Sequence, residues 1–247
     1  MSFVRNIKII FIYFFLIIYS LECLLFLFVP HEQRNMADVK NTRIKIAKEK
    51  GQDFDLRSYH QAYFDIKKSN KALKPMFLYS SAFNDLEVFQ KAKKNNSIIP
   101  FRGPINGSTL SCAEDLKYKI IINDKYGFKN PNNIYEKKIN SFLLGDSYAE
   151  GFCEVSSNDI AGNLNKKLIN TINFGVAGTG PLVSLAILKE FGETFMPENI
   201  IYLYFEGNDL DDLNYEKKEP NLKKYLSDGY HINYLGRYDE IKQFLTI

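Results

Sequence analysis

The chain contains little cysteine and little histidine, and it has no tryptophan. Its 247 residues include 3 cysteines and 3 histidines. They form no Cys-x-x-Cys pair and no Cys/His cluster, which argues against a structural zinc site. Cys23 lies in an apolar run, so only Cys112 and Cys153 could pair, and both a disulfide and two buried free thiols stay open. A disulfide of this spacing would stabilise the fold by about 3–4 kcal/mol through its effect on the unfolded chain.

A surplus of charge of one sign is also missing. Lys and Arg total 32 against 29 Asp and Glu, for a net charge of +3. No basic stripe with interleaved aromatic residues is present, so we expect no nucleic-acid partner. The glycines of 175–180 are spaced Gly-x-x-Gly-x-Gly, the wrong order for a dinucleotide site. The acidic residues of 206–212 are more typical of a solvated turn than of a metal site, so we expect neither a cofactor nor a metal.

One long apolar run is present, close to the N-terminus. Residues 9–29 are almost wholly apolar, and about 20 such residues are enough to span a bilayer. Glu22 is the one charge in the run. A carboxylate at mid-membrane costs about 2.5–3.5 kcal/mol, which the many Phe, Leu and Ile residues offset. No Ala-x-Ala-like cleavage site follows, so the run predicts an uncleaved transmembrane anchor rather than a signal peptide.

The remaining chain divides by pattern into three parts. Residues 1–8 flank the anchor, residues 30–138 form a stalk and an irregular accessory region, and residues 139–247 show regular periodicity. Within the accessory region we expect an amphipathic helix near Asn84–Lys94 and a strand over Lys117–Asn123.

The regular part predicts strands that alternate with helices. Apolar runs at 141–144, 171–176 and 200–205 read as strands, and the third is continuous, as expected for a strand covered on both faces. Between them we expect a helix over about 158–170, with Ile160, Leu164 and Leu168 on its apolar side and Ser157 or Asn158 as its cap, and another that begins at Pro181. This order predicts an α/β fold with a parallel, right-handed sheet.

Polar residues follow each of the three predicted strands. Ser147 ends Gly145-Asp146-Ser147, Gly178 follows the second strand, and Asn208 follows the third. Ligands bind beyond the carboxyl ends of parallel strands, so these residues should meet at one edge of the sheet. A hydroxyl nucleophile with nearby N–H donors is what acyl transfer needs. We therefore interpret Ser147 as a nucleophile, with the Gly178 N–H and the Asn208 amide as oxyanion donors.

This combination resembles the SGNH (GDSL-like) hydrolase family. Gly145–Ser147, Asn173–Gly178 and Gly207–Asp209 match its first three blocks. Further segments resemble a membrane-anchored bacterial branch of the family: Phe54–Ser58, Asp124–Pro131, Gly145–Cys153, Gly178–Leu182 and Glu206–Leu213. The resemblance implies a three-layer, flavodoxin-like parallel sheet, and ester hydrolysis or acyl transfer without a metal.

The fourth block of the family, Asp-x-x-His, has only a doubtful counterpart. Asp228-Gly229-Tyr230-His231 fits the letters, but it follows Asn208 by only about 20 residues. The apolar residues of the flanking segment 225–241 have the spacing of an ordinary helix. Two interpretations of His231 therefore stay open, a general base and an incidental histidine. His31 follows the apolar run and His60 lies in the irregular region, so we expect neither to be catalytic. With three predicted strands before Ile247, we expect an incomplete SGNH domain whose true Asp/His pair lies beyond this sequence.

The sequence therefore predicts a serine esterase that acts on ester-linked acyl groups, for example on cell-envelope glycans. An O-acyltransferase of the same fold, and a catalytically impaired module that binds a glycan or a protein partner, are the alternatives. We expect a single-pass membrane protein whose soluble domain is periplasmic. The family resemblance supports this orientation, whereas the count of Lys and Arg after the apolar run favours the opposite one.

Overall fold

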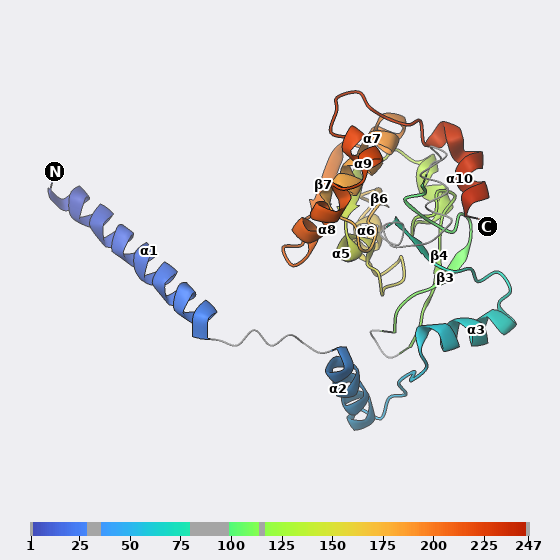
Figure 1. Cartoon of the computed structure of the whole chain (residues 1–247), viewed down its shortest axis with the longest axis horizontal. Coiled ribbons are helices and arrows are strands. Elements are labelled where there is room, and N and C mark those ends of the chain that lie inside the picture. The colour runs from blue at the N-terminus through green and yellow to red at the C-terminus, as the bar shows by residue number, and fades with distance from the viewer. Residues whose placement is uncertain (1, 29–35, 80–98, 114–116, 246–247) are drawn as a thin grey trace. The chain divides into compact units, whose positions relative to one another are not determined.

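The computed structural model describes residues 2–28, 36–79, 99–113 and 117–245 (Figure 1). The chain divides into two compact units, residues 1–53 and residues 54–247. The second unit therefore includes most of residues 30–138, which the sequence predicts to be a stalk and an accessory region.

The first unit consists of two helices, α1 (Ser2–Phe28) and α2 (Met36–Glu49). Large apolar side chains of α1 are exposed, among them Ile10, Ile17 and Tyr19. In the described ranges, no helix reaches the length and apolarity that a bilayer crossing requires. The anchor expected over residues 9–29 is thus not confirmed and stays a prediction.

The second unit contains all the strands of the described ranges. In chain order its elements are α3 (Tyr59–Ser69), β1 (Phe77–Leu78), β2 (Arg102–Gly103), β3 (Ser108–Leu110), β4 (Ile120–Ile122), η2 (Asn132–Glu136), β5 (Ser141–Gly145), α5 (Ser147–Glu150), α6 (Ile160–Lys166), β6 (Thr171–Asn173), α7 (Pro181–Phe195), β7 (Asn199–Leu203), α8 (Asp209–Glu216), α9 (Pro220–Lys224), η3 (Leu235–Arg237) and α10 (Tyr238–Phe244).

The central sheet has three parallel strands in the order β6-β5-β7. The pairing with β5 continues past β6, because Phe174 N donates to Leu143 O and Val176 N donates to Gly145 O. The predicted α/β class with a parallel sheet is confirmed. Two antiparallel pairs, β1-β2 and β3-β4, complete the strands of the described ranges.

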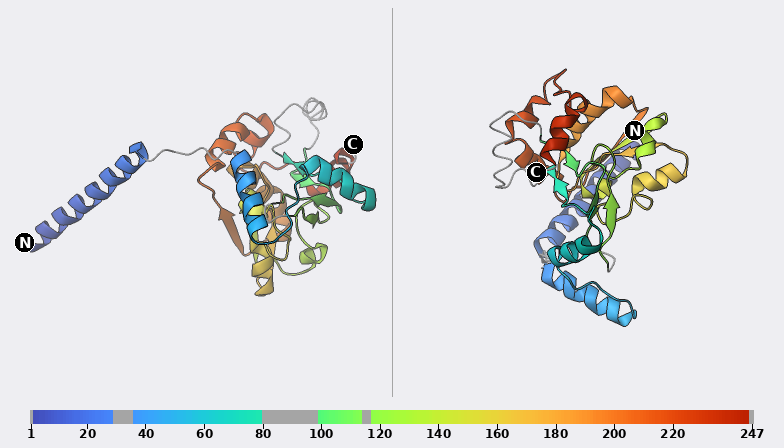
Figure 2. Two further views of the ribbon diagram at one scale, coloured as in Figure 1. Left: turned by 90° about the horizontal axis from the view of Figure 1, so that it is seen from below. Right: turned by 90° about the vertical axis from the view of Figure 1, so that its right-hand side faces the viewer.

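Helices cover both faces of the sheet. On one face Phe142 and Leu144 of β5 belong to the main core together with α7, against which α8 and α9 pack (Figure 1). On the other face Leu143 packs with α5 and α6. The C-terminal helix α10 reaches β1, where the rings of Phe77 and Phe244 lie 6.0 Å apart (Figure 2).

The apolar run of the third strand predicted cover on both faces, but the structure does not show it. β7 is an edge strand, and its residues are exposed or half-buried, with Ile200 44% and Tyr202 39% accessible. The run is continuous because Ile201 and Leu203 pack towards α5 and α6 while Ile200 and Tyr202 line the other face. A continuous apolar sequence therefore identified a strand but not its burial.

The helix predicted over 158–170 is shorter, and its apolar face was wrong. α6 covers Ile160–Lys166 and is capped by Asp159, whose carboxylate accepts from Gly162 N at 2.7 Å. Its buried positions are Ala161 and Gly162, whereas Leu168 lies beyond the helix and is 91% exposed. Small residues face the core here because the Gly162 Cα lies against the backbone of Ser156.

Other expectations outside the central sheet have mixed outcomes. The predicted strand over 117–123 is present as β4, and α7 begins at Pro181 as predicted. The helix predicted over 225–241 is present at its end alone, because the chain is irregular after α9 until η3 and α10 begins at Tyr238. The helix expected near Asn84–Lys94 lies outside the described residues. Helix α3 was not predicted, although Ser58 and Gln61 form a capping box at its start.

Candidate functional site

Ser147 stands where the central strand turns into a helix. β5 ends at Gly145, whose φ is +139°, and a Cβ there would lie 2.6 Å from Leu203 O. Asp146 caps α5 by accepting from Tyr148 N at 2.8 Å. Ser147 is thus the first residue of α5, half-buried at the carboxyl end of β5. We call residues 145–148 the serine turn.

The carboxyl of Asp146 is the hydrogen-bond partner of Ser147. Ser147 Oγ donates to Asp146 Oδ2 at 3.4 Å, and Asp146 is 1% exposed. Burial raises the pKa of Asp146, and the neighbouring charge of Asp209 adds to this, while the Tyr148 N–H opposes it. Among the described residues, Asp146 is therefore the hydrogen-bond partner of the Ser147 hydroxyl.

The segment that carries Gly178 runs alongside α5. Gly175 packs so closely on α5 that an added Cβ would lie 2.2 Å from Glu150 N. Ala177 N donates to Glu150 Oε2 at 2.7 Å, and Gly178 follows with a φ of +70°, a conformation that favours glycine. The structure therefore brings the segment before Gly178 next to the helix that Ser147 begins.

Glu150 also forms a buried ion pair. Its Oε1 accepts from Arg102 Nη2 at 2.7 Å and from Nε at 3.2 Å, and both side chains are almost fully buried. Arg102 further donates to the carbonyls of Phe77 and Gly103. These bonds connect β2 to the helix of Ser147. Sequence reasoning missed both residues, because nothing in the local sequence distinguishes a buried charge from an exposed one.

Asn208 occupies the N-cap position of α8. Its Nδ2 donates to Asp212 Oδ2 at 2.9 Å, while its buried Oδ1 has no hydrogen-bond partner among the described residues. The Asn208 side chain is close enough to Asp146 to lower the pKa of that carboxyl. Asn208 therefore lies near Asp146, the residue that accepts from Ser147 Oγ. We call residues 205–209 the asparagine turn.

Asp209 is a fully buried carboxylate in the asparagine turn. Its Oδ2 accepts from Phe205 N at 2.9 Å and from the Tyr202 hydroxyl at 3.1 Å, and in the described part of the chain no group donates to its Oδ1. Burial, and then the charge of Asp209, raise the pKa of Tyr202. Within the described ranges, no three His, Cys, Asp or Glu side chains are arranged to hold a metal ion.

Asp228 and His231 lie in the irregular segment between α9 and η3. Both are exposed, and among the described residues neither is hydrogen-bonded to Ser147. This segment is fixed by Glu190 of α7, whose carboxylate accepts from Ile232 N and Tyr234 N at 2.7 Å. The structure therefore does not join this pair to the serine turn. His60 lies on α3, and His31 is outside the described residues.

A disulfide anchors the chain just after α5. Cys112 and Cys153 are bonded, with their Cα atoms 5.2 Å apart. The residue before Cys153 is hydrogen-bonded to the serine turn, because Phe152 N donates to Ser147 O at 3.0 Å. Of the two readings left open by the sequence, the disulfide is the one observed.

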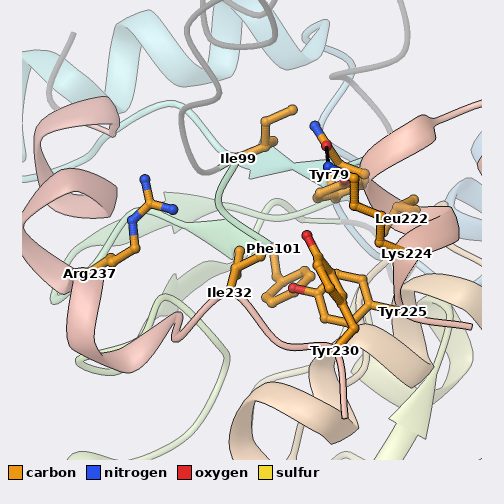
Figure 3. A pocket seen from close by; sticks show the side chains of 10 residues that line it. Tyr79, Ile99, Phe101, Leu222, Lys224, Tyr225, Tyr230, Ile232 and Arg237 are labelled. Carbon is orange, nitrogen blue, oxygen red and sulfur yellow. Dashed lines mark hydrogen bonds between the residues drawn. The ribbon is translucent and has the colours of Figure 1, made fainter. Parts of the chain in front are cut away.

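Two cavities lie in the second unit. One has a volume of about 110 Å³. Figure 3 shows Tyr225, Tyr230, Lys224 and Arg237 among the residues that line it. The other, of about 470 Å³, is lined mainly by apolar side chains of α3 and residues 75–78. Neither cavity is lined by Ser147, Gly178 or Asn208.

The sequence matches no protein-family model, no curated protein and no solved structure. The geometry of the site is therefore the basis for the functional argument.

Proposed function

We propose that the second unit is a serine esterase of the SGNH type, with Ser147 as its nucleophile. The observation that carries this proposal is that Ser147, Gly178 and Asn208 follow the carboxyl ends of three neighbouring parallel segments of one sheet. It is supported by the pairing of Val176 with Gly145 and by the closeness of Asn208 to Asp146. On this proposal the parallel sheet belongs to the three-layer, flavodoxin-like SGNH fold.

The reaction would proceed in two steps. Ser147 Oγ forms a bond to the ester carbonyl carbon, and the alcohol leaves with the proton of the hydroxyl. Water then attacks the acyl-serine, which releases the acid and restores Ser147. The Gly178 N–H and the Asn208 amide would stabilise the oxyanion of each tetrahedral intermediate, and each such donor contributes about 2.7–4 kcal/mol to lowering the barrier. Transfer of the acyl group to a glycan hydroxyl instead of water would make the same site an O-acyltransferase.

One observation favours a second candidate, a module that binds ester-bearing glycans or a protein partner without turnover. Among the described residues, Ser147 is hydrogen-bonded to a carboxyl and not to a histidine. A serine without its general base loses most of its rate, although oxyanion stabilisation leaves a residual activity.

We further propose that the site works outside the cytoplasm, on acyl groups of the cell envelope. The disulfide between Cys112 and Cys153 supports this location, because such bonds persist in oxidising compartments. A membrane anchor over residues 9–29 remains part of the proposal.

Labelling with a fluorophosphonate probe tests the esterase. We expect the full chain to be labelled, and Ser157→Ala, which changes an exposed serine in the same unit, to be labelled equally. Ser147→Ala should remain unlabelled. If the folded wild-type chain is not labelled, the esterase is wrong and the binding module is favoured. Comparing the O-acetyl content of envelope glycans in cells with and without Ser147→Ala then tests the substrate class, and no change would count against it.

A further inference from the structure

The loop that carries Gly178 is held at both ends by buried glutamates. On the side of α5, Glu150 accepts from Ala177 N. On the other side, the carboxylate of Glu216 accepts from Gly180 N at 2.6 Å, Leu182 N at 2.9 Å and Val183 N at 3.4 Å. These N–H groups belong to the start of α7, where Gly180 at the N-cap has no side chain to satisfy them.

Glu216 and Asn208 belong to the same short helix. Asn208 is the N-cap of α8 and Glu216 is its last residue, 1% exposed. The loop and the helix touch directly, since a Cβ on Gly180 would lie 2.9 Å from Leu213 N and 3.1 Å from Asp209 O. One helix therefore presents Asn208 at its start and binds the Gly178 loop at its end.

We propose that Glu216 is a positioning residue for the two oxyanion donors. Its carboxylate fixes the Gly178 loop against α8, and this fixes the separation between the Gly178 N–H and the Asn208 amide. The consequence for catalysis rests on the proposed function, whereas the fixing of the loop concerns the fold alone. Nothing in the sequence motifs of the serine turn or the asparagine turn involves Glu216.

The surroundings of Glu216 make its anchoring depend on pH. Burial raises its pKa to about 7, the three N–H donors oppose this, and the charge of Asp212 adds to it. The charge of Glu216 in turn contributes to the raised pKa values of Tyr202 and Tyr79, which burial chiefly causes. Above about pH 7 both oxygens can accept from the loop, whereas below it one oxygen carries a proton and becomes a donor.

The same group affects stability in the opposite direction. Its folded pKa of about 7 lies above the ordinary value of 4.5, so the folded chain binds this proton more tightly than the unfolded chain. The resulting stabilisation is present below about pH 4.5 and is lost as the pH rises through 7. The charged form, which holds the loop best, is therefore the form that the fold disfavours.

The loop can be observed without any enzymatic activity. We expect the amide resonances of Gly180 and Leu182 in the ¹⁵N-labelled full chain to shift with a midpoint near pH 7. Glu216→Gln should abolish the shift, and Glu193→Gln, an exposed position on α7, should preserve it. Resonances of these amides that are unchanged by Glu216→Gln, or that titrate equally in it, would overturn the proposal. If the Gln variant does not fold, hydrogen exchange in the wild type decides instead, and unprotected Gly180 and Leu182 amides would overturn the proposal.

Labelling by the fluorophosphonate probe tests the catalytic consequence. Displacement of a donor by about 1 Å can cost about 10²-fold in rate, so we expect Glu216→Gln to label about 10²-fold more slowly than wild type. Glu216→Asp, which keeps the charge with a shorter reach, should fall between them. Equal labelling of Glu216→Gln and wild type would show that Glu216 does not position the donors. A wild type that is not labelled would refute the esterase, and the amide titration would still decide the fixing of the loop.

Discussion

The serine turn and the asparagine turn follow two neighbouring parallel strands, but they are supported in different ways. The serine turn follows the central strand β5, whose residues are all buried, and it is fixed by Glu150, Arg102 and a disulfide just beyond α5. The asparagine turn follows the edge strand β7, which is largely exposed, and two of its buried oxygens have no partner among the described residues. The position of Ser147 is thus set by the core, and the position of Asn208 depends on a few polar contacts.

The largest effect should come from breaking the buried ion pair beneath the serine turn. Glu150→Ala leaves the guanidinium of Arg102 buried without its partner, which typically costs about 3–5 kcal/mol. Urea unfolding followed by circular dichroism measures this. The double change Arg102→Met with Glu150→Leu is the control, because replacing both charges by apolar groups should cost much less. Equal losses for the single and the double variant would contradict the comparison.

Removing the disulfide should weaken the same turn by a smaller amount. Cys112→Ser combined with Cys153→Ser frees a closed segment with a sequence separation of 41. The expected loss is about 2–4 kcal/mol in the free energy of unfolding. Thermal unfolding of the variant and of the wild type, each with and without reductant, measures it. A wild type that is insensitive to reductant would show that the bond contributes little.

The asparagine turn should respond to the loss of a single hydroxyl. Tyr202→Phe removes the donor to Asp209 Oδ2 and leaves Phe205 N as the described partner of that oxygen. A typical hydrogen bond within a protein contributes a net of about 0.5–1.5 kcal/mol to the free energy of unfolding. Tyr215→Phe, an exposed tyrosine on α8, is the matched control and should leave the free energy of unfolding unchanged.

The smallest effect is expected on the strand that precedes the asparagine turn. Ile200 pairs with Phe142 across β5 and β7, yet Ile200 is 44% exposed and Phe142 is 0% exposed. Ile200→Ala should therefore cost less than about 1 kcal/mol, whereas Phe142→Ala should cost about 3–5 kcal/mol. Similar losses at the two positions would mean that β7 is as firmly held as β5.

The strands of the sheet could be predicted from the sequence, and so could the two turns that follow β5 and β7. Apolar runs that end in Gly145-Asp146-Ser147 and in Gly207-Asn208-Asp209 locate both turns, because parallel strands share one carboxyl edge. What could not be read was which strand would be central. Both β5 and β7 are continuous apolar runs, and only the pairing of strands distant in sequence decides that β7 forms the edge.

The supporting charges were equally hidden. Glu150, Arg102 and Glu216 have no local pattern, since their partners are backbone groups and side chains from distant segments. The helix predicted over 158–170 failed for a related reason. Close backbone packing at Gly162 buries small residues and leaves Leu168 exposed, so the apolar spacing did not report the buried face.

The bond between Cys112 and Cys153 also turns the middle of the chain into a closed covalent ring. Ser147, β4 and β5 all lie within this ring, and exposed Lys137 lies on it as well. A protease that cuts once after Lys137 would leave a single species on a non-reducing gel, and two fragments would separate only after reduction. The peptide that contains Ser147 would thus remain tethered to the N-terminal part of the chain even after its backbone connection had been cut.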